Sequence, residues 1–359
     1  MKKQTILLTG ASGEVGFEAF KELFNRRQRY NIRLLNLDHK FERQRFAPYN
    51  GQVEIVYGDL RNPDTVQEAV RGVDGVIHAA ALIPPLADEN PGLARAVNVG
   101  GTRSLVAALT EQNPAARLVY TSSISVYGDR VENPQIRVGD PLEPSDGDEY
   151  AKTKVQAEEL IQASGLKWTI LRLSGILTER LHIQPLMFHM PLNTALEWCH
   201  SSDAGLALVQ ALEHEGVLGR IFNLGGGDAC RISAREFLYK MLPLFGVDAE
   251  ALPEQAFATR NFHSGDYADG DELDALLDFR RKTLTDYFEM AKKRISPASR
   301  ALVRMIPNFI VRAYFTAISD PLKAIRRGDA ELIRRYFGSL EAFNILSLRA
   351  KRSSLRHLR

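Results

Sequence analysis

The chain has 359 residues, enough to bury a large core, and its 45% hydrophobic and 25% charged residues are ordinary for a globular protein. Two cysteines, Cys199 and Cys230, exclude a disulfide framework and a cysteine zinc site, and no segment offers 18 uncharged apolar residues for a spanning helix. Residues 279–359 hold 19 Lys and Arg and 6 Asp and Glu, a charge of +13, against −11 for the preceding 278 residues, which predicts a distinct basic C-terminal module.

The N-terminus bears on location. After Met1-Lys2-Lys3 the apolar run is only Ile6–Leu8 before a glycine-rich turn, which is too short for the core of a signal peptide. We therefore expect a cytoplasmic protein. The basic C-terminal module raises the alternative that the protein associates with the cytoplasmic face of a membrane.

Residues 1–175 alternate between strand-like and helix-like segments. Strands are expected at 5–9, 32–37, 53–57, 75–80, 117–122 and 168–173, with helices up to about 27 and at 63–70, 93–111 and 149–163. This alternation predicts an α/β fold with a doubly wound parallel sheet, the Rossmann type. We expect three regions: a dinucleotide-binding domain at 1–175, a substrate-binding region at 176–278 with a strand near 221–224 returning to the sheet, and a helical extension at 279–359.

The first chemical motif is the sequence TGASGEVG, which follows the first strand and opens a helix. Gly10 allows a tight turn, Gly13 lets a phosphate approach the backbone, and Gly16 lets the helix pack against the strand. The helix N-terminus, with Glu14 and Val15, adds free N–H groups and a positive dipole end. The glycine spacing is G-x-x-G-x-x-G, so the motif departs from the usual G-x-G-x-x-G dinucleotide fingerprint.

Asp38 lies 22 residues past Gly16, at the end of the second expected strand. A carboxylate there can accept hydrogen bonds from both ribose hydroxyls and would repel a 2′-phosphate. The next residues, His39 and Lys40, include no Arg, so the sequence favours NAD over NADP. The alternative is that Asp38 is only a turn residue.

Tyr150 and Lys154 stand four residues apart, on one face of an expected helix. An unperturbed tyrosine has a pKa of about 10, and a fixed ammonium one turn away would lower that pKa. Such a phenol could move a proton to or from a substrate hydroxyl. Because a doubly wound sheet binds ligands beyond the C-terminal ends of its strands, Ser123, which follows the fifth strand, should face the same crevice.

Taken together, these motifs make the chain resemble the extended short-chain dehydrogenase/reductases, the NAD-dependent epimerase/dehydratase family. The residues that carry the resemblance are TGASGEVG at 9–16, Asp38, Gly58–Leu60, His78–Ala81, Val97–Thr102, Thr121–Gly128 and YAKTK at 150–154. The resemblance is weaker through Arg172 and 219–226 and ends near residue 245.

The resemblance implies roles for individual residues. Asp59 and Leu60 would sit beside the adenine, and Ala79, Ala80 and Ala81 along the cofactor. Ser123 would hydrogen-bond the reacting oxygen, Tyr150 would be the acid/base, and Lys154 would also hold the nicotinamide ribose. Asn98 is implied to lie near the cofactor, with the alternative that its amide ties down backbone.

Three functions follow as expectations. The first is an NAD-dependent oxidoreductase that interconverts a secondary alcohol and a ketone on a sugar-like or lipophilic small molecule. The second is a redox-neutral sugar epimerase, and the third a non-catalytic dinucleotide-binding regulator or membrane-associated protein. Ile124 and Ser125 replace the Asp-Glu pair of the family's sugar 4,6-dehydratases, which argues against dehydration.

The remainder of the chain gives weaker signals. Three histidines, His182, His189 and His200, match no common metal-site spacing, so no metal is expected. Asp203 is interpreted as a helix cap, and the acidic residues at 266–274 as a solvated linker and helix start. The segment 279–359 is interpreted as a helical cap on the substrate region, as part of a homodimer, or as a peripheral membrane contact. It contains no recognised nucleic-acid-binding module.

Overall fold

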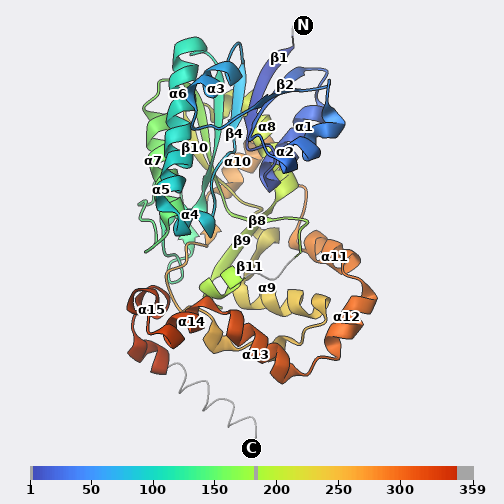
Figure 1. The fold of residues 1–359 in the computed structure, drawn as a ribbon, viewed down its shortest axis with the longest axis vertical. Coiled ribbons are helices and arrows are strands. Elements are labelled where there is room, and N and C mark those ends of the chain that lie inside the picture. Colours follow the sequence, from blue (N-terminus) through green and yellow to red (C-terminus); the bar gives the residue numbers. More distant parts are fainter. Residues whose placement is uncertain (1–2, 182–184, 346–359) are drawn as a thin grey trace, which may run out of the picture.

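The computed structural model describes residues 3–181 and 185–345 (Figure 1). Its strands are β1 (Gln4–Thr9), β2 (Tyr30–Asn36), β3 (Glu54–Tyr57), β4 (Gly75–His78), β5 (Arg117–Ser123), β6 (Gln135–Ile136), β7 (Lys167–Leu173), β8 (Gly175–Leu177), β9 (Ala195–His200), β10 (Arg220–Leu224), β11 (Arg231–Ser233) and β12 (Asp266–Tyr267). Its α-helices are α1 (Glu14–Asn25), α2 (Lys40–Phe46), α3 (Pro63–Ala69), α4 (Leu86–Glu89), α5 (Pro91–Ala94), α6 (Gly101–Gln112), α7 (Glu149–Gln162), α8 (Ser201–Glu213), α9 (Ala234–Met241), α10 (Gly270–Leu277), α11 (Leu284–Arg294), α12 (Pro297–Arg304), α13 (Asn308–Ile318), α14 (Asp320–Arg327) and α15 (Ala330–Phe337).

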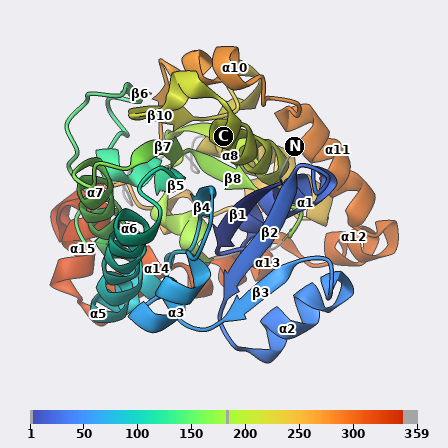
Figure 2. The ribbon, with the colours of Figure 1, turned by 90° about the horizontal axis from the view of Figure 1, so that it is seen from above.

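The larger lobe is built on a seven-stranded sheet in the order β10-β7-β5-β4-β1-β2-β3, with every neighbouring pair parallel. Helices α1 and α8 cover one face, and α3, α6 and α7 cover the other (Figure 2). Both faces are therefore buried, which is why β4 is buried at all four positions. The predicted doubly wound parallel fold is confirmed.

One expected element is wrong in detail. The single helix predicted at 93–111 is α5, then a π-helical segment at Arg95–Gly100, then α6. The wider turn lies at Asn98, whose side chain bonds to groups outside the helix. Tertiary hydrogen bonds of this kind leave no periodicity in the sequence, so the π segment could not be predicted from it.

The smaller lobe lies below the C-terminal ends of the large sheet's strands (Figure 1). It holds a three-stranded sheet in the order β11-β9-β8, with α9 and the C-terminal helices packed around it. Val311 and Phe315 of α13 are buried in one apolar cluster with Phe188 and Leu238. The basic segment after residue 278 is thus helical through α15 and packs on the smaller lobe.

Candidate active site

Ser123, Tyr150 and Lys154 meet at the C-terminal end of β5. Ser123 is the last residue of β5, and the other two lie in the first turns of α7. Asp148 caps this helix by accepting a hydrogen bond from the Ala151 N–H at 2.8 Å. The Lys154 Nζ lies 5.6 Å from the centre of the Tyr150 ring, and a hydrogen bond from Ser123 reaches the Tyr150 hydroxyl. The structure therefore brings the three predicted residues together.

The expected electrostatics of Tyr150 are wrong for the ligand-free protein. Burial is the largest influence on its pKa, and with the nearby charge of Asp148 it raises that pKa above the ordinary value, although the bond from Ser123 lowers it. Burial also lowers the pKa of Lys154 to about 7, despite the carboxylate of Glu158. With a pKa of about 7, Lys154 is only partly protonated at neutral pH, so in the ligand-free protein it favours the phenolate less than an ordinary lysine would.

The packing around Lys154 fixes where its amine points. Its side chain is 1% exposed, its Nζ donates to the Thr121 carbonyl at 2.7 Å, and it stands 4.6 Å from the centre of the Tyr120 ring. Buried His78, between Thr9 and Thr102 hydroxyls at 2.7 and 2.9 Å, has a pKa lowered to about 3 by burial and by Lys154. His78 is therefore neutral near pH 7 and adds no charge beside Lys154.

A cleft of about 360 Å³ runs along the ends of β1, β2, β3 and β4. Its walls include seven of the predicted cofactor residues: Gly10, Gly13, Asp59, Leu60, Ala79, Ala80 and Ala81. They also include residues that sequence reasoning missed: Ser12, Leu35, Asn36, Leu37, Glu42, Gly58, Arg61, Leu82, Leu93 and Val97. Most of the missed residues flank the quoted motifs, so a wider window around each motif would have found them.

The glycine-rich turn fits an anionic ligand. Gly10 has a φ of +73°, and a Cβ there would come within 2.5 Å of the Ala80 nitrogen; at Gly16 a Cβ would lie 2.0 Å from the Gly10 carbonyl oxygen. At Gly13 the nearest atom would be 3.4 Å away, so the missing side chain leaves the turn's backbone open. No side chain caps α1 at Gly13, which leaves free N–H groups for phosphate oxygens.

Asp38 lies differently from the expectation. Its carboxylate is exposed and forms two hydrogen bonds with the Arg43 guanidinium, at 2.6 and 3.0 Å, and this pairing lowers the pKa of Asp38. An arginine thus does lie beside Asp38, because the first turn of α2 places Arg43, five residues further along the chain, next to it. The cleft wall itself holds two carboxylates, Asp59 and Glu42, and Glu42 accepts a hydrogen bond from the Ser12 hydroxyl at 2.6 Å.

Asn98 ties down backbone, the second of its two predicted roles. Its Oδ1 accepts from the Leu82 N–H at 2.7 Å, and its Nδ2 donates to the Leu82 carbonyl at 3.0 Å and to Thr153 at 2.9 Å. Leu82 borders the cleft, and Thr153 adjoins Lys154 in α7. Asn98 therefore joins the cofactor cleft to the helix that carries Tyr150, through the backbone of Leu82 on one side and the hydroxyl of Thr153 on the other.

A second pocket, of about 340 Å³, lies in the smaller lobe. Apolar and aromatic side chains make up most of its wall: Ile176, Leu177, Leu181, Leu186, Met187, Met190, Trp198, Phe237, Leu238, Met241, Leu242, Phe245, Phe262 and Tyr287. Among the described wall residues, Thr178 and Tyr287 carry hydroxyls, Arg180 carries a charge, and Trp198 carries an indole N–H. A wall of this kind binds an apolar ligand with few polar groups to pair.

Two contacts join this apolar pocket to the larger lobe. Arg180 of the pocket wall forms an ion pair with Glu14 at the start of α1, with 2.9 Å between Nε and Oε1. Phe262 of the pocket wall is followed by His263, whose Nδ1 lies 3.2 Å from the carboxylate of Asp148, the cap of the Tyr150 helix. The wall of the apolar pocket is thus tied to the start of α1 directly and to the cap of the Tyr150 helix through the residue after Phe262.

The remaining candidates have structural roles. The prediction that Asp203 caps α8 is wrong. Its carboxylate instead accepts hydrogen bonds from the Arg281 and Lys282 N–H groups, at 2.8 and 2.9 Å. The His189 Nε2 lies 3.1 Å from Asp320, and the His200 Nε2 lies 2.9 Å from the Thr283 carbonyl. His182 lies outside the described residues. Among residues 3–181 and 185–345 no group of three His, Cys, Asp or Glu is placed to hold a metal.

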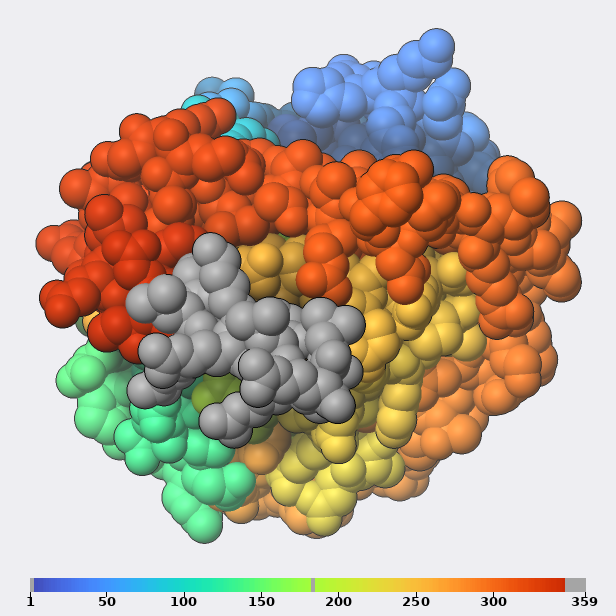
Figure 3. All heavy atoms as spheres, turned by 90° about the horizontal axis from the view of Figure 1, so that it is seen from below, coloured from blue at the N-terminus to red at the C-terminus, as the bar shows by residue number. Residues whose placement is uncertain are grey.

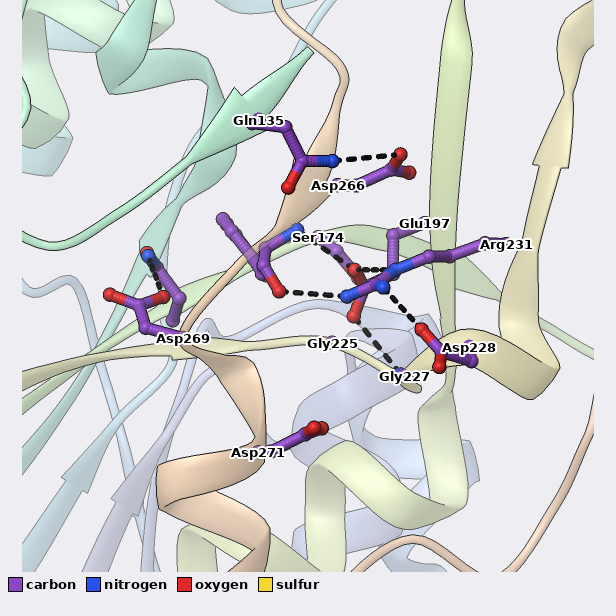
Figure 4. A network of polar contacts seen from close by, with 12 residues as sticks. Gln135, Ser174, Glu197, Gly225, Gly227, Asp228, Arg231, Asp266, Asp269 and Asp271 are labelled. Atoms are coloured by element: carbon purple, nitrogen blue, oxygen red, sulfur yellow. Dashed lines mark hydrogen bonds and ion pairs between the residues drawn. The ribbon is translucent and has the colours of Figure 1, made fainter.

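The acidic region after residue 265 is more ordered than the expected linker (Figure 4). Buried Glu197 of β9 accepts hydrogen bonds from the Gly227 N–H at 3.0 Å and from the Tyr267 N–H and Arg231 Nε at 2.9 Å each. Asp269 accepts from the Val138 N–H at 2.6 Å. These bonds hold β9, β11, β12 and the loop after β10 together. Asp271 and Glu272 lie in the first turn of α10, as predicted.

Comparisons with known proteins agree with this geometry. Residues 7–172 match the 3-beta hydroxysteroid dehydrogenase/isomerase family. A 3 beta-hydroxysteroid dehydrogenase/Delta 5-->4-isomerase of Mycobacterium tuberculosis is 33% identical over 184 residues, covering 48% of this chain and 46% of the relative. An N-acetyl-alpha-D-glucosaminyl-diphospho-ditrans,octacis-undecaprenol 4-epimerase of Escherichia coli O157:H7 is 35% identical over 159 residues, covering 44% and 42%. The chain thus spans less than half the length of these two relatives.

A solved structure extends the likeness of the fold. A dTDP-glucose 4,6-dehydratase from Streptomyces venezuelae, crystallised with NAD, superposes with a TM-score of 0.69 at 21% identity, covering 81% of this chain and 98% of that one. At that identity the likeness shows the fold, a Rossmann sheet with a smaller second lobe. The cofactor expected from the sequence, NAD, is the one that this structure contains.

Proposed function

We propose that the chain is an extended short-chain dehydrogenase/reductase that binds NAD and interconverts a secondary alcohol and a ketone on a lipophilic substrate. The family match over residues 7–172 supports this proposal. The observation that carries the proposal is the meeting of Ser123, Tyr150 and Lys154 at the end of β5, in the lobe that also holds the open glycine-rich turn. The apolar pocket of the smaller lobe is linked to this lobe through the Arg180–Glu14 and His263–Asp148 contacts. The chain then offers a candidate for each part that a hydride-transfer enzyme needs: the glycine-rich turn for the cofactor, the three polar residues for proton transfer and the apolar pocket for the substrate.

Bound NAD would supply the hydride acceptor. The residues of the chain orient the substrate and move its proton: the Ser123 hydroxyl holds the carbinol oxygen, and the Tyr150 hydroxyl exchanges a proton with it. Oxidation of the alcohol requires Tyr150 as a phenolate, so its raised pKa must fall in the loaded enzyme. A cation held beside the phenol has this effect, and Lys154 supplies one when it is protonated.

The lipophilic substrate is proposed from the composition of the apolar pocket. A sugar carries a hydroxyl on nearly every carbon, and each buried hydroxyl without a partner costs about 1–3 kcal/mol. The pocket wall offers few side-chain partners among many apolar groups: Thr178, Arg180, the Tyr287 hydroxyl and the Trp198 N–H. A hydrocarbon skeleton with one hydroxyl suits such a wall, and the relative that acts on a 3 beta-hydroxysteroid points to the same substrate class.

The test is turnover with a panel of substrates. Purified protein would be denatured to assay released NAD, then incubated with NAD and hydroxysteroids, long-chain secondary alcohols or nucleotide sugars while NADH absorbance is followed. We expect NADH with the lipophilic alcohols and a loss of about 10²–10⁴-fold in Tyr150→Phe, with no loss in the exposed control Tyr314→Phe. Failure to bind NAD, or equal rates in Tyr150→Phe and wild type, would contradict the proposal.

A second candidate is a redox-neutral epimerase. It is favoured by the similarity to the epimerase of a lipid-linked sugar, whose long isoprenoid chain would also suit an apolar pocket. An epimerase returns its hydride to the same substrate and so keeps NAD tightly bound. Stoichiometric NAD after gel filtration, with no NADH released in the substrate panel, would favour this candidate over the dehydrogenase.

A further inference from the structure

Large apolar side chains are exposed together where α12 meets α13. Six of them lie within 13 residues and form what we call the apolar corner: Leu302 (67% exposed), Met305 (79%), Ile306 (40%), Phe309 (73%), Ile310 (47%) and Tyr314 (55%). The C-terminal helices form a continuous orange and red band over this end of the molecule (Figure 3). Contiguous apolar exposure of this kind marks a surface that contacts something else.

The apolar corner is not a misplaced piece of core. The opposite side of α13 already packs inward through Val311, 8% exposed, and Phe315, 1% exposed. The boundary between the exposed and buried sides of α13 thus runs between the adjacent residues Tyr314 and Phe315. A helix that is apolar on both sides is normally buried on both, and within the described residues one side of α13 faces solvent.

The segment that forms the corner carries an excess of cations, beside two carboxylates from the segment after α9. Asp248 accepts from the Asn308 Nδ2 at 2.7 Å, and Asp248 and Glu250 line a hollow with Arg304 and Ile306. Residues 290–319 contain six Lys and Arg residues and no Asp or Glu. Two of them, Arg300 and Arg312, donate to the backbone carbonyls of Leu244 and Glu250 at 3.0 and 2.8 Å. A backbone carbonyl carries no formal charge, so these bonds do not neutralise the guanidinium groups. Exposed Arg304 lies in the middle of the apolar corner. Exposed apolar groups on a segment with an excess of cations are complementary to a surface with hydrocarbon beneath anionic headgroups.

The geometry indicates a surface contact. No single described helix is long and apolar enough to cross a membrane; α12 and α13 reach that length and composition only together, and they meet at 97°. Because the inner side of α13 is part of the core of the smaller lobe, the pair cannot straighten without unfolding that lobe. The pair can, however, lay the six exposed side chains into the interface of one leaflet.

We propose that the apolar corner docks the protein on the surface of an anionic phospholipid bilayer. α12 also lies against the wall of the apolar pocket, because the Arg300 Nε donates to Leu244, between the pocket residues Leu242 and Phe245. Docking therefore places that pocket close to the leaflet. The use of the membrane as a source of lipophilic substrate rests on the proposed function, whereas docking itself does not.

The test is sedimentation of the full chain with phosphatidylcholine vesicles that contain or lack phosphatidylglycerol. We expect binding to the anionic vesicles that weakens as salt is added. Met305→Ser/Phe309→Ser and, separately, Lys293→Gln/Arg304→Gln should each weaken binding by about tenfold or more. The matched control is Phe41→Ser, which removes an aromatic ring 54% exposed on α2 of the other lobe, and it should sediment like the wild type.

Two outcomes would overturn the docking proposal. One is equal sedimentation of the wild type and both corner variants. The other is a dimer of the wild type, by light scattering, that becomes a monomer in Met305→Ser/Phe309→Ser, since a second copy would then cover the corner. Thermal melting of each variant checks that it is folded. The vesicle assay requires no substrate, so its failure would leave the dehydrogenase proposal standing.

Discussion

Lys154 shows at the scale of one residue what burial does to a charge. Its amine is buried with a pKa of about 7, well below the ordinary value for lysine, whereas in the unfolded chain it regains that value. Between these two pKa values the unfolded chain binds a proton that the folded chain does not. The free energy of unfolding contributed by Lys154 therefore rises with pH from about 7 to about 10.

This dependence gives the first prediction. In ligand-free Lys154→Met, the free energy of unfolding should rise less between about pH 7 and about pH 9 than in the wild type, by about 2 kcal/mol. Denaturant titrations at the two pH values measure it. The control is Lys152→Met, which removes an exposed lysine of the same helix. This variant should keep the wild-type slope. Identical slopes in Lys154→Met and wild type would contradict the low pKa.

Asp38 and Arg43 govern the choice of cofactor in the second prediction. The carboxylate holds the guanidinium through two hydrogen bonds, at 2.6 and 3.0 Å. In Asp38→Ala the freed Arg43 can pair with a 2′-phosphate, and the loss of the carboxylate removes both a ribose partner and a repulsive charge. We expect the ratio of the NADP and NAD dissociation constants to shift toward NADP by about tenfold or more.

Calorimetric titration with both dinucleotides measures this ratio. The double variant Asp38→Ala/Arg43→Ala should lose the gain for NADP while keeping the weaker binding of NAD. If Asp38→Ala binds NADP no better than the wild type does, Arg43 does not reach the 2′ position. The sequence could predict the carboxylate, because it follows a strand, but not its partner, because the partner depends on where α2 begins.

At the scale of elements, a buried ion pair joins α7 to the sheet. Glu158 of α7, 0% exposed, binds the guanidinium of Arg172 of β7 at 3.0 and 2.6 Å and also accepts from the Ser122 hydroxyl of β5. Burial alone would lower the pKa of Arg172, but the hydrogen bonds and charge of Glu158 outweigh it and raise that pKa above the ordinary value, so the guanidinium stays charged. The helix that carries Tyr150 is thus fixed to the two strands beside it.

Removing one partner gives the third prediction. Glu158→Gln leaves a buried guanidinium without its counter-ion, so the free energy of unfolding should fall by about 3–5 kcal/mol. Glu159→Gln, at the next and exposed position, should change it by less than about 0.5 kcal/mol. Thermal and denaturant unfolding of the three proteins measure the difference. A loss in Glu158→Gln as small as that in Glu159→Gln would show that the pair does not hold α7.

The elements also show where sequence reasoning stops. The strands of the large sheet were predicted to within a few residues because apolar runs between turns are local signals. The π segment at Asn98 and the role of Asp203 were missed because each depends on a partner far along the chain: Leu82 and Thr153 for the first, Arg281 and Lys282 for the second. The Ser123, Tyr150 and Lys154 positions could be predicted, whereas their pKa values could not, since burial decides those.

At the scale of the whole molecule, charge and shape link the two lobes. The sequence predicted a basic C-terminal module, but it could not show that α13 packs against Phe188 and Leu238 of the smaller lobe. It also gave no sign of the ion pair between Glu14 and Arg180, which joins the start of α1 to the wall of the apolar pocket. This pair lies where the cofactor's phosphates would approach the helix N-terminus.

The last prediction follows from that position. Arg180 neutralises a carboxylate beside the free N–H groups of α1, so in Arg180→Gln the unpaired Glu14 should repel a pyrophosphate. Because Arg180 is 59% and Glu14 35% exposed, solvent screens the effect, and we expect NAD to bind about threefold more weakly at low salt. Glu14→Gln/Arg180→Gln should restore the affinity, and added salt should remove the difference between wild type and Arg180→Gln. If the double variant binds NAD as weakly as Arg180→Gln does, Arg180 acts by its own contact with the cofactor and not through Glu14.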